Sequence, residues 1–184
     1  MKKEITDLAD TSRGIRYTIV VILIILLGGL IGGSKVFGQE KVSLNVSVDG
    51  RLALLGDENN SPLTANILVK IEMQGNQQTW GFMHIAPEYE YADLSSGNYH
   101  RYSANVGYTF NKFAIERLEV GGAMGFGFII HKSHGTFFSL GAQVDFGYRV
   151  TDRLRFVTTM QLVDRTEKRR LVSSIFGGVK YYLN

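Results

Sequence analysis

The sequence predicts an all-β protein, an up-and-down antiparallel transmembrane β-barrel of about eight strands, preceded by an N-terminal hydrophobic signal helix. Two observations support this class. Runs of about 10 residues alternate between apolar and polar side chains, which is the period of a strand with one apolar face. In these runs the polar face also carries the small residues, and the apolar face carries the large aromatic ones. Because small residues suit a crowded concave lumen and large ones a convex wall, we expect the apolar face to contact lipid.

The clearest run is residues 136–150, TFFSLGAQVDFGYRV. Its even positions are apolar: Phe138, Leu140, Ala142, Val144, Phe146, Tyr148 and Val150. The odd positions between them are small or polar: Ser139, Gly141, Gln143, Asp145, Gly147 and Arg149. A soluble barrel hides its apolar set and an outer-membrane barrel exposes it to lipid, and the sizes of the side chains favour the second arrangement.

The other predicted strands follow the same pattern. They cover residues 42–54, 66–74, 80–91, 100–110, 118–130, 154–163 and 171–183. Leu68 interrupts the alternation of the second strand by falling on the polar face. In the third strand Pro87 cannot donate a hydrogen bond to a neighbour, so we expect a bulge or a local break there. Each run is close to the ~9 to 11 residues that a tilted membrane strand needs.

The N-terminal segment has the features of a secretory signal. Basic residues including Lys2 and Arg16 precede residues 17–31, which are continuously apolar. The small residues Ser34 and Gly38 offer a cleavage site, so we expect a signal peptide over residues 1–38 and a barrel domain over residues 39–184. An uncleaved signal anchor stays open as an alternative, because the apolar run is close to the ~17 residues that span a bilayer as a helix.

Composition narrows the function classes. The chain of 184 residues has 21 Gly, two Pro and no Cys, so disulfides and thiolate metal sites are excluded. The net charge is only +3 and the basic residues are scattered, which gives no nucleic-acid footprint. No sequence pattern indicates a cofactor. His131 and His134 form a pair of potential metal ligands, but the pair lacks a third ligand.

Aromatic residues gather near the ends of the predicted strands. We expect Tyr89, Tyr91, Tyr99 and Tyr102 at one membrane interface. The set at the opposite interface is Tyr108, Phe110, Phe156 and Tyr181. Such clustering is typical of the two aromatic girdles of a transmembrane barrel.

The pattern resembles a known family. The signal segment, the amphipathic strands, the run GGAMGFGF, the short turn at residues 151–153 and the closing strand ending VKYYLN are similar to small outer-membrane barrels of the OmpX/Ail and OmpA-transmembrane-domain type. The resemblance covers residues 39–184 and implies an outer-membrane location and the outer-membrane insertion machinery as a partner. That machinery reads a terminal aromatic residue, whereas here Leu183 and Asn184 follow Tyr182. We further expect a monomer that contacts membrane lipids and lipopolysaccharide.

Charged residues of both signs fall on the face predicted to line the lumen. They are Asp49, Arg51, Lys70, Glu72, Glu88, Glu90, Arg101, Glu119, Asp145, Arg149, Arg155 and Lys180. An isolated buried charge is very costly, so we expect these side chains to pair in a network that fills the barrel. The alternative is a path for protons or ions, which would make the protein a narrow channel or transporter.

The predicted rims carry residue types found in hydrolases and acyltransferases. They include His100, His131, His134, Ser95, Ser96, Asp93, Asp57 and Asp164. Nothing in their spacing fixes a catalytic geometry, so a rim-located enzyme is the third function class. The first is a structural or surface-interaction barrel without a catalytic site.

A basic cluster lies in the predicted loop over residues 165–170. Its members are Arg165, Lys168, Arg169 and Arg170. If the barrel starts in the periplasm, this loop opens on the cell exterior, level with lipopolysaccharide phosphates. Arg binds phosphate through bidentate, charge-assisted hydrogen bonds, so the cluster is a candidate lipopolysaccharide contact. The alternative is a solvated loop with Glu167 among its charges.

Overall fold

The computed structural model is a closed antiparallel β-barrel over the residues that it describes, which are 41–55, 65–93, 98–131, 135–165 and 170–183. The predicted fold class and strand number are confirmed. The strands are β1 (Lys41–Asp49), β2 (Ala65–Gln74), β3 (Gly81–Asp93), β4 (Tyr99–Phe110), β5 (Leu118–His131), β6 (Gly135–Arg149), β7 (Leu154–Arg165) and β8 (Arg170–Tyr182). The predicted signal segment lies outside the described residues.

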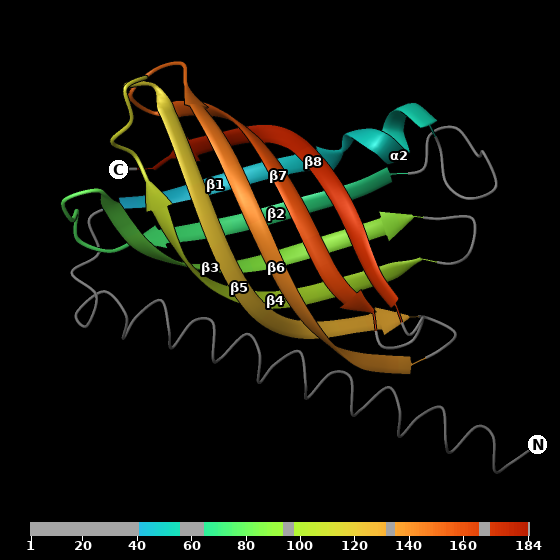
Figure 1. Ribbon diagram of the computed structural model, residues 1–184. Helices are drawn as coiled ribbons and strands as arrows, with labels where there is room; N and C mark the ends of the chain where they lie inside the picture. Colours follow the sequence, from blue (N-terminus) through green and yellow to red (C-terminus); the bar gives the residue numbers. More distant parts are fainter. Residues whose placement is uncertain (1–40, 56–64, 94–97, 132–134, 166–169, 184) are drawn as a thin grey trace, which may run out of the picture. The chain divides into compact units, whose positions relative to one another are not determined.

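Each strand pairs with its neighbours in the sequence, and β8 pairs with β1 to close the barrel (Figure 1). Val46 of β1 therefore lies between Val69 of β2 and Val179 of β8. We call the end where β1, β3, β5 and β7 finish the loop end, and the end where β2, β4 and β6 finish the turn end. The turn end carries the connections at residues 75–80, 111–117 and 150–153.

The wall is apolar outside and polar inside, as the alternation predicts. Met124 on the outer face is 73% exposed, whereas Lys70 on the inner face is 1% exposed. Leu68 faces inward with the polar residues of its strand, as the sequence pattern predicts. No helix within the described ranges is long and apolar enough to cross a membrane.

The first strand ends earlier than the alternation predicts. Instead of continuing to residue 54, the chain forms the short helix α2 (Gly50–Leu55) at the loop end (Figure 1). The Asp49 carboxylate accepts a hydrogen bond from the Leu52 backbone N–H at 3.1 Å. An acidic residue in this position caps the first turn of a helix, which explains why the strand stops at Asp49.

Pro87 interrupts the ladder without adding a residue. Strands β2 and β3 pair up to Lys70 with Glu88 and resume at Met73 with Ile85 in the same register. On its other side Pro87 pairs with Ala104 of β4. The structure thus has the local break and not the bulge, because Pro lacks only the N–H that one neighbour needs.

Tyr99 does not belong to the aromatic girdle in which the sequence analysis places it. It shares the inward parity of Arg101 and is 6% exposed, and its hydroxyl donates to the Glu90 carboxylate at 2.6 Å. Tyr89, Tyr91 and Tyr102 lie on the outer face, where side chains on neighbouring strands make ring contacts. The girdle at this end therefore has His100 where the prediction has Tyr99.

Candidate functional site: the barrel interior

The turn end of the lumen is filled by two ion pairs around a tyrosine. Lys180 of β8 donates to Glu72 of β2 at 2.6 Å. Arg155 of β7 donates to Glu119 of β5 at 2.8 Å. The Arg155 guanidinium also stacks over the Tyr182 ring, 4.0 Å from its centroid, a favourable cation–π contact. These contacts link four strands of the wall: β2, β5, β7 and β8.

Uncharged polar side chains complete this turn-end group. Gln74 donates to Glu72 at 3.0 Å and to the Tyr182 hydroxyl at 2.8 Å. His84 is buried on the inner face of β3, and one of its ring nitrogens lies 3.2 Å from the Thr109 hydroxyl. Buried polar groups are costly without such partners, so these contacts let the lumen stay charged.

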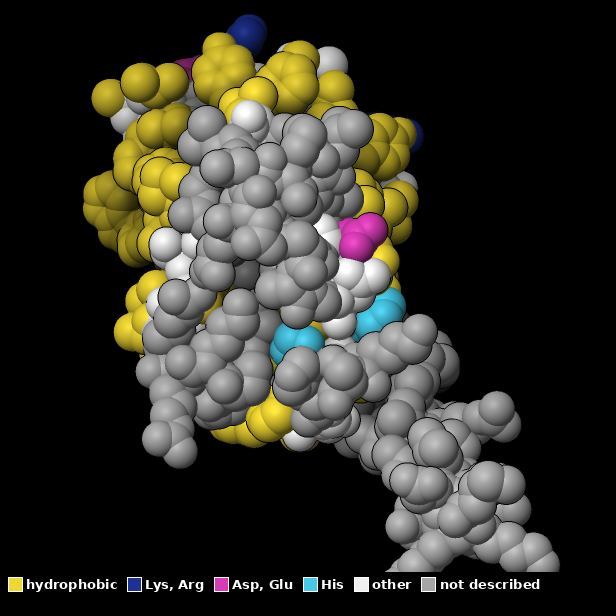
Figure 2. Space-filling model, turned by 90° about the vertical axis from the view of Figure 1, so that its right-hand side faces the viewer, with side chains coloured by type: hydrophobic (Ala, Val, Ile, Leu, Met, Phe, Trp, Pro, Cys, Tyr) yellow, Lys and Arg dark blue, Asp and Glu magenta, His cyan; other side chains and the backbone are white. Residues whose placement is uncertain are grey.

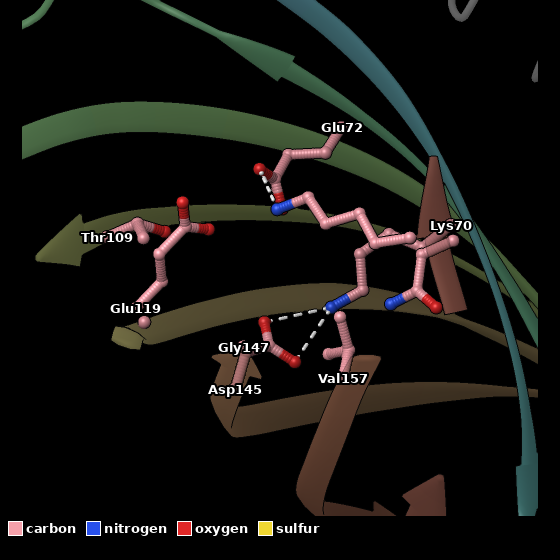
Figure 3. Close-up of a pocket in the computed structure, with 10 residues that line it drawn as sticks. Lys70, Glu72, Thr109, Glu119, Asp145, Gly147 and Val157 are labelled. Carbon is pink, nitrogen blue, oxygen red and sulfur yellow. Dashed lines mark hydrogen bonds and ion pairs between the residues drawn. The ribbon is translucent and has the colours of Figure 1, made fainter. Parts of the chain in front are cut away.

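The middle of the lumen is organised around Lys70. Its ammonium lies 3.0 Å from an Asp145 oxygen and 3.5 Å from a Glu88 oxygen, so one cation serves two carboxylates. Figure 3 shows the paired contact of Lys70 with Asp145 inside the barrel. Thr159 donates to Asp145, and Ser103 donates to Glu88 at 3.4 Å. These neutral donors occupy lone pairs that the single ammonium leaves.

The loop end of the lumen combines one ion pair with an apolar cluster. Arg101 lies 3.4 Å from Glu90, which also accepts from Asn66 at 3.0 Å. A Cβ built on Gly141 would lie 2.8 Å from an Arg101 nitrogen, so the glycine makes room for the guanidinium. Beside this pair, four buried apolar side chains pack together: Ala92, Tyr99, Ile129 and Val163. Alternation alone did not place an apolar cluster inside the barrel.

A small cavity remains between the turn-end group and Lys70. Its volume is about 10 Å³, which is room for about one water molecule. Its lining includes Lys70, Glu72, Glu119, Asp145 and Lys180. Figure 3 shows the carboxylates of Glu72, Glu119 and Asp145 directed towards it from different strands. The space is too small for a hydrated ion to pass without rearrangement of the charged side chains.

The structure brings most of the predicted charges together and places three elsewhere. The ion pairs contain Lys70, Glu72, Glu88, Glu90, Arg101, Glu119, Asp145, Arg155 and Lys180. Asp49 caps α2, and Arg51 lies in that helix rather than in a strand. Arg149 is not in the lumen network: it donates to the Glu116 backbone carbonyl at 2.5 Å, at the turn end. It is the last residue of β6, so its side chain reaches past the wall.

The strands on either side of the predicted basic loop reach its first and last residues. Arg165 ends β7 and pairs with Arg170, which begins β8. Lys168 and Arg169 lie outside the described residues. The sequence analysis did not include the neutral polar residues that contact the lumen charges, for example Tyr182, Gln74 and Thr159. Their inward-facing positions in the alternating pattern could have identified them.

The rim residues considered for catalysis do not assemble a recognisable site in the described part of the chain. One His100 ring nitrogen lies 2.9 Å from the Tyr89 hydroxyl rather than beside a carboxylate. Ser95, Ser96, Asp57 and His134 lie outside the described residues. Among the described residues no group of three His, Cys, Asp or Glu side chains is placed to hold a metal ion.

An apolar exterior, a charged interior and eight consecutively paired strands define a transmembrane β-barrel of the outer-membrane type. The fold is similar to that of the outer membrane protein Ail of Yersinia pestis, with a TM-score of 0.53 and 13% identity over 78% of this chain and 99% of that one. Neisserial surface protein A matches with a TM-score of 0.44 and 11% identity over 77% of this chain and 93% of that one. At these identities the likeness to Ail is one of fold. No protein-family model and no curated protein sequence matches the chain.

Proposed function

We propose that this chain is an outer-membrane barrel that acts through its outer surface and loop end, and that it neither conducts solutes nor catalyses a reaction. The filled lumen carries this proposal. Ion pairs cross the middle and the turn end, and the apolar cluster lies at the loop end. The cavity beside the ion pairs has room for only about one water molecule. A barrel of eight strands has an interior that side chains just fill.

Electrical recording from refolded protein in planar bilayers tests this proposal. We expect no steady conductance at neutral pH, because the paired charges block the lumen. Opening a path would require these ion pairs to separate, and each charge would then be buried and unpaired. Bilayers without protein provide the baseline. Reproducible, ion-selective current from pure protein would overturn the proposal in favour of a narrow channel.

We also propose a lipopolysaccharide contact at the loop end, formed by Arg165, Lys168, Arg169 and Arg170. Two facts support it: Arg165 and Arg170 are paired residues at the ends of β7 and β8, and guanidinium groups bind phosphate bidentately. Replacing all four residues with Ser should weaken lipopolysaccharide binding most at low salt, since exposed charges are screened as salt rises. The control replaces Lys112, Arg117 and Arg153, which are exposed at the turn end, with Ser. Unchanged binding and salt dependence in the first variant would reject the contact.

A further inference from the structure

A groove lies on the outer wall of the barrel near the loop end, over β3, β4 and β5. Its lining is Tyr89, Tyr91, Asn98, His100 and Ile130, and its volume is about 560 Å³. These side chains lie on the lipid-facing side of the wall, so the groove is separate from the lumen. Figure 2 views the loop end and shows histidine side chains at its surface.

The groove changes in polarity along the barrel axis. Towards the membrane centre, a row across four strands pairs Tyr89 with Tyr102, Tyr102 with Phe128, and Phe128 with Phe138. This row is aromatic and carries hydroxyl groups only at its β3 and β4 members.

The next row towards the loop end is more polar. It pairs Tyr91 with His100 and His100 with Ile130, and Asn98 follows beyond it. An apolar wall that leads to hydroxyl, imidazole and amide groups matches an amphiphile whose chain lies along the barrel and whose head lies at its rim.

Ring contacts and hydrogen bonds hold the polar groups of the groove in place. The His100 ring is stacked on Tyr89 at 6.0 Å and tilted against Tyr91 at 5.1 Å. Its Nδ1 atom is engaged with the Tyr89 hydroxyl at 2.9 Å, and Asn98 donates weakly to the Tyr91 hydroxyl at 3.5 Å.

The chemistry of the lining favours a neutral, hydroxyl-rich head. None of the five described lining residues is Lys or Arg, so these five side chains offer a phosphate no permanent cation. A pyranose ring presents C–H groups on its faces and hydroxyls at its edge. The faces fit the negative faces of aromatic rings, and the hydroxyls fit the imidazole and amide. We propose that this groove binds the sugar headgroup of a membrane glycolipid, which rests on the membrane location proposed above.

The test uses the full chain in phosphatidylcholine nanodiscs that contain increasing fractions of a glucosyl diacylglycerol. Nuclear magnetic resonance follows the ring protons of Tyr91 and His100 and the side-chain amide of Asn98. We expect saturable shifts and nuclear Overhauser contacts with the sugar protons. Phosphatidylglycerol with the same acyl chains, and free glucose without chains, should not produce them.

Two variants make the assignment specific. Tyr91→Leu with His100→Leu removes the polar head of the groove and keeps a lipid-compatible wall, and it should weaken the saturable response about tenfold or more. Tyr108→Leu removes an outer-face tyrosine from the turn-end part of β4, the strand that carries His100, and should leave the response unchanged. The amide spectrum of each variant shows whether it is folded.

Three results would overturn the proposal. An equal response to phosphatidylglycerol would mean that the groove selects phosphate, and an equal response to free glucose would remove the lipid from the assignment. A response that never saturates, or that persists in the double variant, would mean partition into the bulk bilayer. None of these results bears on the conductance experiment, so the surface role and the glycolipid site succeed or fail separately.

Discussion

Lys180 and Glu72 show what burial demands of a single charged residue. Both side chains are almost fully removed from solvent, and their polar atoms approach to 2.6 Å. In such a place each charge offsets the cost of desolvating the other, and the pair as a whole adds little stability. The loss of one partner is therefore far more damaging than the loss of both.

Lys180→Met should destabilise the barrel by about 3 to 5 kcal/mol, because Glu72 is left as a buried, uncompensated carboxylate. Adding Glu72→Leu to this variant should recover much of the loss. Denaturant unfolding in lipid vesicles measures both variants. Lys112→Met, in an exposed turn, serves as the control and should change little. A double variant that is no more stable than Lys180→Met would contradict the proposed pairing.

Parity in the sequence predicted which charged residues face the lumen but not which of them meet. Lys180 and Glu72 are 108 positions apart in the chain and become neighbours only because β8 pairs with β1, which in turn pairs with β2. Arg149 shows a second limit, since it has inward parity but lies at the very end of β6. Its long side chain then reaches a backbone carbonyl of the adjacent turn instead of the lumen.

At the scale of the element, alternation predicted the strands well and their ends less well. Residues 42–54 keep an alternating pattern through α2, so periodicity alone extends β1 too far. The capping contact from Asp49 decides the boundary, and it depends on local hydrogen bonding that a period-two pattern does not register.

Asp49→Ala should destabilise the start of α2 by about 0.5 to 2 kcal/mol, because the Leu52 N–H loses its acceptor. Asp49→Asn keeps an acceptor and should cost less. Amide hydrogen exchange at Leu52 reports the local effect directly. Equal protection in the wild type and the Ala variant would show that the cap does not hold this helix.

Val144→Arg should destabilise the barrel by roughly 2 to 4 kcal/mol, because Val144 lies on the outer face near the middle of β6. Asn76→Arg adds the same side chain in an exposed turn-end connection and should have little effect. Unfolding titrations in vesicles compare the two variants. Equal costs would mean that position 144 does not face the apolar core of a bilayer.

At the scale of the whole molecule, the number and order of the strands follow from the sequence because each strand pairs with the next along the chain. Eight runs with short connections leave few other arrangements for a sheet that has to hide its edges from lipid. The contents of the lumen were less predictable. The apolar cluster of Ala92, Tyr99, Ile129 and Val163 joins side chains from four strands, and only the closed barrel brings them together.

The central claim is that the wall is inverted, with its apolar face towards lipid and its charges inside. Nuclear Overhauser contacts between lipid acyl-chain protons and side-chain methyl groups of the unmodified protein in nanodiscs test it most directly. Outward Val144 and inward Ala123 make a matched pair, because Val144 pairs with Gly122 and Ala123 pairs with Gln143 at neighbouring rungs of the same two strands. We predict contacts from lipid to the methyl groups of Val144 and Leu140, and none to those of Ala123 or Val157. Contacts of equal strength at both sets, or stronger contacts at Ala123 and Val157, would contradict the inverted barrel.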